Sequence, residues 1–118
     1  MHKCVLLIDD EEDLCDALRD VLEDRGYRVL VAHNGQEGLE VLRDGEQPCF
    51  VLLDLMMPVM DGWRFLEVVG ADPALARIPL TISTSAPERA PKGRPVIPKP
   101  VDLRTLLDHV QRACGAPP

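Results

Sequence analysis

The chain has 118 residues, of which 13 are Lys or Arg and 20 are Asp or Glu, so its formal net charge is -7. This length suits a single domain with a hydrophobic core, and we take residues 1–118 as one domain in which 115–118 form a short tail. The acidic balance disfavours direct binding to nucleic acid or to an anionic membrane surface. No segment approaches the roughly 20 apolar residues of a membrane span, and we expect a cytoplasmic protein.

Strand patterns and helix patterns alternate along the chain. The predicted strands cover 4–8, 27–32, 50–53 and 79–84, with a further short one at 95–98. Four helices are predicted. The first begins near Asp13, the second covers 34–45, the third includes 63–69 and the last covers 101–114. Alternation of this kind predicts an α/β fold in which a parallel sheet has helices on both faces.

The fraction of apolar residues in each run indicates whether the strand lies at the centre or at the edge of the sheet. The runs CVLLI (4–8) and FVLL (50–53) are wholly apolar, which is typical of central strands covered on both faces. Arg28 in the second run and the prolines around 95–98 suit edge strands. We therefore predict a doubly wound sheet of order 2-1-3-4-5, in which ligands bind beyond the carboxyl ends of the first and third strands.

Three carboxylates fall at that predicted position. Asp9 and Asp10 directly follow the first strand, and Asp54 directly follows the third. A single acid after a strand is more often the N-cap of the next helix. Three acids meeting at adjacent strands repel one another, so their joint presence indicates a bound cation. An all-oxygen site of this kind suits Mg²⁺ better than zinc or copper.

Two further side chains would complete a site for phosphoryl chemistry. Thr84 ends the fourth strand and Lys99 follows the fifth, so both are expected at the same rim of the sheet. Alone, Thr84 would be an ordinary turn residue and Lys99 an ordinary solvated lysine. Together with the carboxylates they supply a hydroxyl donor and a cation, as an in-line phosphoryl transfer requires. Asp54 stands alone at its strand end and is the best candidate nucleophile.

These residues lie in the strings IDDEED (8–13), LLDLMMPVMDG (52–62), ISTSA (82–86) and Lys99-Pro100. With them, the chain resembles the receiver domain of two-component response regulators from Cys4 to about Cys114. The resemblance implies a flavodoxin-like (βα)5 fold of order 2-1-3-4-5.

The resemblance also implies a role for each site residue. Asp54 would be the phosphoacceptor and also a metal ligand, Asp10 a direct Mg²⁺ ligand and Asp9 a ligand acting mainly through water. The backbone carbonyl of Met56 would be the third protein ligand. Thr84 would hydrogen-bond the phosphoryl oxygen, and Lys99 would pair with it before a Lys-Pro bond that is usually cis. Pro58 and Gly62 would shape the loop after Asp54.

The implied function is signalling by phosphorylation rather than turnover of a separate substrate. A histidine kinase or histidine phosphotransfer protein would donate its phosphoryl group to Asp54, and the receiver would catalyse this step and the later hydrolysis itself. The phosphorylated form would then switch an output protein that the sequence does not name. The resemblance places kinase docking on the first helix, with Cys15 and Arg19 exposed. His2, His33 and His109 are interpreted as surface or packing residues.

The segment between Thr84 and Lys99 departs from the family pattern. It is too short for the fourth helix that receivers usually have there, and Pro91 and Gly93 would interrupt a helix. We expect at most one turn near Pro87, with the fourth helix absent or replaced by a proline-rich loop. Because family dimers often use this region, we expect a monomer.

A second departure concerns coupling to the output. Val96 occupies the position where receivers often carry a Tyr or Phe that moves with the Thr. We therefore expect phosphorylation to be retained and the usual coupling to be lost or rebuilt in the loop.

Two alternative functions compete with this hypothesis. The chain could be an interaction module that binds a partner without phosphorylation through the altered 85–98 surface. It could also be a metal-dependent hydrolase of small phosphate esters, although no second acidic motif or substrate-capping insertion is found.

The cysteines carry one further expectation. Cys4, Cys15, Cys49 and Cys114 are widely spaced, form no CxxC pair and have no histidine placed to complete a zinc site. We expect reduced, mostly buried thiols.

Overall fold

The computed structural model describes residues 3–45 and 47–115. The strands are β1 (Cys4–Ile8), β2 (Arg28–Ala32), β3 (Phe50–Asp54), β4 (Leu80–Thr84) and β5 (Val96–Pro98). The α-helices are α1 (Glu12–Asp24), α2 (Gly35–Arg43), α3 (Gly62–Ala71) and α4 (Leu103–Cys114). The strands form one parallel sheet in the order β2-β1-β3-β4-β5, which confirms the predicted topology.

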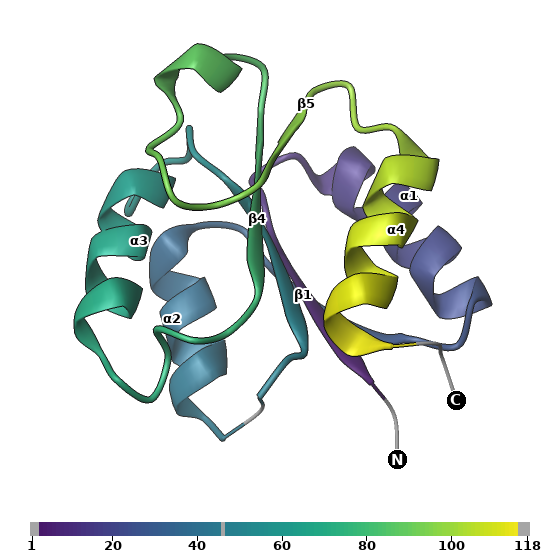
Figure 1. Cartoon of the computed structure of the whole chain (residues 1–118), viewed down its shortest axis with the longest axis horizontal. Coiled ribbons are helices and arrows are strands. Elements are labelled where there is room, and N and C mark those ends of the chain that lie inside the picture. Colours follow the sequence, from purple (N-terminus) through teal and green to yellow (C-terminus); the bar gives the residue numbers. More distant parts are fainter. Residues whose placement is uncertain (1–2, 46, 116–118) are drawn as a thin grey trace.

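The sheet is covered on both faces, as Figure 1 shows, with α1 and α4 on one side and α2 and α3 on the other. Successive side chains of a strand point to opposite faces. On β1, Leu6 and Ile8 pack in the cluster with α2 and α3, whereas Val5 and Leu7 pack in the cluster with α1 and α4. All five residues of β1 are buried, which explains why this strand has no polar alternation.

Side-chain caps fix the start of three helices. Asn34, Asp61 and Asp102 each accept a hydrogen bond from the backbone N–H three residues ahead. The predicted N-cap Asp102 is therefore confirmed. The predicted helix at 34–45 is shorter than expected, because Asn34 is its cap and Gly45 has a positive φ of 91°.

The connection between β4 and β5 contains no α-helix, as the proline pattern predicted. A single 3₁₀ turn, η1 (Pro87–Arg89), stands between β4 and β5, and Pro87 is at its start. Ala90 from this connection and Val96 at the start of β5 pack against the cluster that contains α2 and α3. Arg94 ties the end of the connection to the loop before β4, donating to the carbonyl oxygens of Ile78 at 3.1 Å and Ala76 at 3.2 Å.

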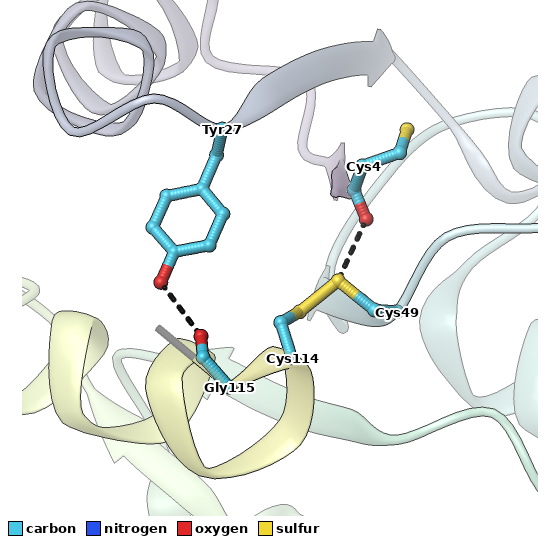
Figure 2. Close-up of a disulfide and its surroundings, with 5 residues drawn as sticks. All are labelled: Cys4, Tyr27, Cys49, Cys114 and Gly115. Carbon is cyan, nitrogen blue, oxygen red and sulfur yellow. Dashed lines mark hydrogen bonds between the residues drawn. A yellow bond between two sulfur atoms is a disulfide. The ribbon is translucent and has the colours of Figure 1, made fainter. Parts of the chain in front are cut away.

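The expectation that all the cysteines are reduced thiols is wrong for one pair. Cys49 and Cys114 form a disulfide, with their Cα atoms 5.2 Å apart. The two lie 65 positions apart in the chain, but the fold brings the start of β3 against the end of α4 (Figure 2). Cys4 and Cys15 are buried thiols.

Within the described residues, no helix is long and apolar enough to cross a membrane. Of the three histidines, His33 lies beside Glu37 at 3.4 Å and His109 contacts the Thr81 hydroxyl at 3.1 Å, so each packs against a neighbour. His2 and residues 116–118 of the expected tail lie outside the described residues.

Candidate functional site

The three predicted carboxylates converge at the carboxyl ends of the two central strands. Asp9 and Asp10 follow β1, and Asp54 ends β3. Each offers a carboxylate oxygen, and these oxygens lie within 4.8 Å of one another. Asp9 is 7% exposed and Asp54 is 6% exposed, whereas Asp10 faces solvent. The cluster is therefore a half-enclosed group of negative charges with one side open.

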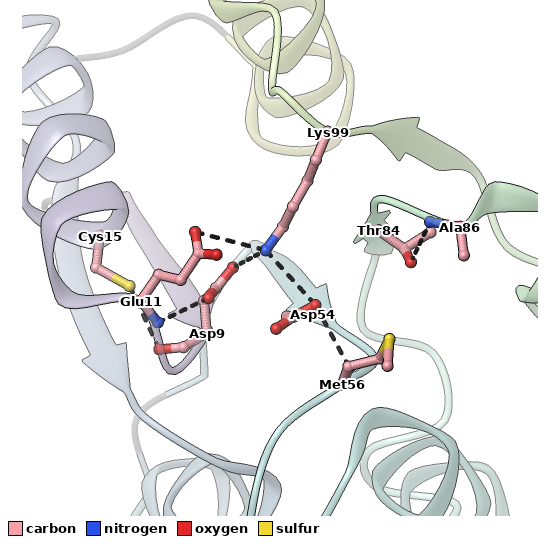
Figure 3. Close-up of polar contacts among 8 residues, drawn as sticks. All are labelled: Asp9, Glu11, Cys15, Asp54, Met56, Thr84, Ala86 and Lys99. Carbon is pink, nitrogen blue, oxygen red and sulfur yellow. Dashed lines mark hydrogen bonds and ion pairs between the residues drawn. The ribbon is translucent and has the colours of Figure 1, made fainter.

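Lys99 supplies the positive charge at the centre of this group (Figure 3). Its Nζ lies 2.9 Å from Asp9 Oδ2 and 3.6 Å from Asp54 Oδ1. The backbone N–H of Lys99 donates to the carbonyl oxygen of Thr84 at 2.9 Å, which fixes where the side chain begins. Burial alone would lower the pKa of Lys99, but the hydrogen bond and charge of Asp9 and the charge of Asp54 raise it above its usual value.

Asp54 is the carboxyl group whose ionisation is most opposed by its surroundings. Burial, together with the neighbouring charge of Asp9, raises the pKa of Asp54 to about 6. Lys99 and a hydrogen bond from the Met56 backbone N–H, at 3.4 Å from Oδ1, act against this shift. A carboxylate with a raised pKa is a better nucleophile once it is ionised, and a cation beside it favours the ionised form.

Thr84 lies at the rim of the same cavity, where its hydroxyl accepts one backbone hydrogen bond and keeps its own proton to donate. The cavity is lined by Asp10, Asp54, Met56, Thr84 and Lys99 together with Glu11, Leu14, Ser85, Pro100 and Val101. Thr84 Oγ1 accepts a hydrogen bond from the backbone N–H of Ala86 at 3.1 Å, and Figure 3 shows it turned toward Ala86. The side chain is 2% exposed.

The donor set fits a hard divalent cation. Three carboxylates at mutual distances that one ion can span provide only oxygen ligands, which is the chemistry that Mg²⁺ prefers. Met56 lines the cavity, which is consistent with a ligand from its backbone. The assignment of its carbonyl, and of individual roles to Asp9 and Asp10, stays a prediction. The expected cis bond between Lys99 and Pro100 is present.

Two features near the site differ from or add to the sequence-based expectation. Cys15 was expected to be exposed on α1, but it is 2% exposed and its thiol donates to the Asp9 carbonyl oxygen at 3.5 Å. Burial and the charge of Asp9 raise the pKa of Cys15 to about 12, so this thiol is unreactive. Sequence reasoning also gave no role to Glu11, whose carboxylate lies 3.9 Å from Lys99 Nζ. The acidic run DDEED was the available signal.

A sharp loop connects Asp54 to α3. The backbone N–H of Gly62 donates to the Leu55 carbonyl oxygen at 2.9 Å, so α3 begins directly against the end of β3. A Cβ atom at Gly62 would lie 2.6 Å from the Asp54 carbonyl oxygen. The predicted structural role of Gly62 thus has a steric basis, because only glycine allows this approach. Within the loop, Val59 has a positive φ of 68° and is 84% exposed.

Fold and site together define a doubly wound α/β domain with an acidic pocket and a central lysine at its topological switch point. The family model of the response regulator receiver domain matches residues 5–111, and the chain belongs to this family. It is therefore a receiver domain of the response regulator type, consistent with a phosphoacceptor role.

Comparisons with individual proteins agree. The chain is 33% identical to Protein PilH of Pseudomonas aeruginosa over 113 residues, which cover 90% of this chain and 93% of PilH. It is 32% identical over 111 residues to the transcriptional regulatory protein CpxR of Escherichia coli, covering 91% of this chain but only 47% of CpxR. The solved structure of the chemotaxis response regulator CheY4 of Vibrio cholerae superposes with a TM-score of 0.82 at 26% identity, covering 96% of this chain and 99% of the CheY4 chain.

Proposed function

We propose that this receiver accepts a phosphoryl group on Asp54 from the phosphohistidine of a histidine kinase or a histidine phosphotransfer protein. The observation that carries the proposal is the convergence of Asp9, Asp10 and Asp54 around Lys99 at the open end of the sheet. A carboxylate oxygen of Asp54 would form the new bond to phosphorus while the bond from phosphorus to the histidine nitrogen breaks. The site would catalyse this transfer, and the later hydrolysis, without a separate enzyme.

Each residue has a definite part in the proposed transfer. Asp9, Asp10, Asp54 and the Met56 carbonyl would hold Mg²⁺, which would neutralise phosphoryl charge and orient the incoming group. Lys99 would exchange part of its contact with Asp9 for a phosphoryl oxygen, since its three donors can serve both. Thr84 would donate its hydroxyl to another phosphoryl oxygen. The phosphorylated receiver would then switch an output protein in the cytoplasm.

Acetyl phosphate provides a direct test. Wild-type protein incubated with acetyl phosphate and Mg²⁺ should gain the mass of one phosphate group, measured on the intact protein, and chelation of the metal should prevent the gain. The variant Asp54→Asn should gain nothing, whereas the exposed-site control Asp20→Asn should behave as the wild type.

The same experiment separates the competing functions. If the wild type forms no adduct, the proposal is wrong and an interaction module that works without phosphorylation is favoured. Multiple turnover of small phosphate esters by the wild type would instead indicate a hydrolase.

A further inference from the structure

Trp63 on α3 contacts Arg89 on η1, the turn in the connection between β4 and β5. The indole Nε1 of Trp63 donates to the backbone carbonyl oxygen of Arg89 at 3.4 Å. The Arg89 guanidinium lies over the indole ring, 5.5 Å from its centroid, which is within the range of a cation–π contact. Trp63 also packs against the buried cluster on this face of the sheet. The pair thus clamps η1 to the start of α3.

A short series of hydrogen bonds links this clamp to the phosphoacceptor site. Thr84 Oγ1 accepts from the Ala86 N–H at 3.1 Å, and the Ala86 carbonyl oxygen accepts from the Arg89 N–H at 2.9 Å. Pro87 lies between them at the start of η1, and its nearly fixed φ limits how the turn can rearrange. The Thr84 hydroxyl is therefore connected to the Trp63 indole through one turn of backbone.

The Thr84 hydroxyl accepts a hydrogen bond from Ala86 and still has its own proton to donate (Figure 3). It can therefore donate to a phosphoryl group on Asp54 while it keeps the Ala86 N–H. Breaking the bond to Ala86 would leave a partly buried backbone donor without its acceptor, which is costly. When the side chain is drawn toward the phosphoryl group, the backbone of 85–86 therefore follows it and displaces η1.

We propose that Trp63 and Arg89 are positioning residues that act through Ala86 on Thr84, holding its hydroxyl away from Asp54 until phosphorylation releases η1 from α3. This inference rests on the proposed phosphorylation of Asp54. The contact between α3 and η1 would then couple the site to the output. Val96 cannot do this, because it lacks the aromatic side chain that receivers often carry at its position. The clamp opposes the phosphorylated state, and because coupling is reciprocal, loosening the clamp favours that state.

Beryllofluoride with Mg²⁺, which mimics an aspartyl phosphate, gives a test with two readouts. Trp63 is the only tryptophan in the chain, so its emission reports on the clamp directly. In the wild type, beryllofluoride should shift the emission to longer wavelength as the indole loses Arg89 and gains water. The Thr84→Ala variant should lose this shift even when fluorine NMR shows that beryllofluoride is bound, because the hydroxyl no longer drives the turn.

The second readout is affinity. Arg89→Ala should bind beryllofluoride about two- to fivefold more tightly than the wild type, since one exposed cation–π contact is removed from the unphosphorylated state. Trp63→Phe, which keeps a ring but lacks the N–H donor, should change affinity in the same direction by less. The matched control is Arg64→Ala, because Arg64 is the next residue of α3 and pairs only with Glu67 among the described side chains. It should leave affinity unchanged.

The outcomes distinguish this inference from the function on which it rests. An unshifted Trp63 emission with beryllofluoride bound, or an Arg89→Ala variant that binds no more tightly than Arg64→Ala, overturns the clamp and leaves phosphorylation of Asp54 standing. Failure of the wild type both to bind beryllofluoride and to form the phosphate adduct overturns the proposed function and this inference with it. A merely structural role would lower stability without tightening binding.

Discussion

At the scale of single residues, Asp54 carries a charge that its surroundings oppose. Burial and, second to it, the charge of Asp9 raise the pKa of Asp54 from its ordinary value of 3.8 to about 6. Lys99 offsets only part of this cost, because its Nζ is closer to Asp9 than to Asp54. Keeping this buried carboxyl group ionised lowers the free energy of unfolding, and a bound cation would raise it again in part.

The substitution Asp54→Asn should therefore stabilise the metal-free protein at neutral pH. Since the folded-state pKa is raised, the stability that Asp54 contributes is fully present below its unfolded-state pKa of 3.8 and is lost as pH rises through about 6. Removing the titration should raise the free energy of unfolding by about 1–3 kcal/mol near pH 7.5 and by clearly less near pH 5. Urea unfolding in the presence of a chelator measures both.

Asp20→Asn is the control for this prediction, because Asp20 lies exposed on α1 and its substitution changes the net charge equally. Its effect should be small at both pH values. Equal stabilisation by Asp20→Asn and Asp54→Asn would mean that overall charge, rather than burial of Asp54, sets the effect.

At the scale of elements, the start of α3 packs closely against the backbone next to the site. The nearest atoms to a Cβ at Gly62 would be the Asp54 carbonyl oxygen at 2.6 Å and the Leu55 Cα at 2.7 Å. Both are backbone atoms of the segment that presents Asp54, so neither can move without displacing the site. Gly70, near the other end of the same helix, has open space around its Cβ position.

Gly62→Ala and Gly70→Ala should consequently have opposite effects. Gly62→Ala should lower the free energy of unfolding by about 1–3 kcal/mol through overpacking, and it should slow phosphorylation because Asp54 is displaced. Gly70→Ala should raise the free energy of unfolding by about 0.5–1 kcal/mol, since alanine is the better helix former. Denaturant unfolding and the rate of adduct formation check both variants. A stabilised Gly62→Ala would contradict the close approach described here.

The elements also show what the sequence could predict. Strand order followed from local signals, namely the pure apolar runs of β1 and β3, Arg28 on an edge and the prolines around β5. The convergence of Asp9, Asp10 and Asp54 followed from one rule, that parallel strands end at the same edge of the sheet. The loss of a helix before β5 followed from Pro91 and Gly93.

The contacts that escaped prediction depend on neighbours distant in sequence. Nothing in the local pattern around Trp63 indicates Arg89, because their contact arises only when the shortened connection folds back over α3. Cys15 was assigned to the exposed side of its helix, but a small shift in the helical phase places it beneath Asp9. For the same reason Cys49 and Cys114 gave no sign of pairing, since no spacing rule links residues on different elements.

At the scale of the whole molecule, the two ends of the sheet have different roles. The carboxyl ends of the strands carry the charged site, whereas the opposite end fastens α4 to the sheet. There the disulfide joins Cys49, before β3, to Cys114, and the Tyr27 hydroxyl donates to the Gly115 carbonyl oxygen at 3.2 Å (Figure 2). Burial raises the pKa of Tyr27, so this hydroxyl keeps its proton and remains a donor at neutral pH.

The disulfide should contribute strongly to stability in the oxidised protein. Its partners are separated by 65 positions, and cross-linking a loop of that size removes chain entropy from the unfolded state worth about 4 kcal/mol. Reductant should therefore lower the urea midpoint of the wild type, and Cys114→Ser should unfold near the reduced wild type whether or not reductant is added. Alkylation of the denatured protein counts the free thiols. Only Cys4 and Cys15 should be labelled before reduction, and all four cysteines should be labelled after it. Two results would contradict this prediction and show that the fold holds α4 in place without the disulfide. One is labelling of Cys49 and Cys114 in the unreduced, air-oxidised protein. The other is a reductant effect on Cys114→Ser as large as the effect on the wild type.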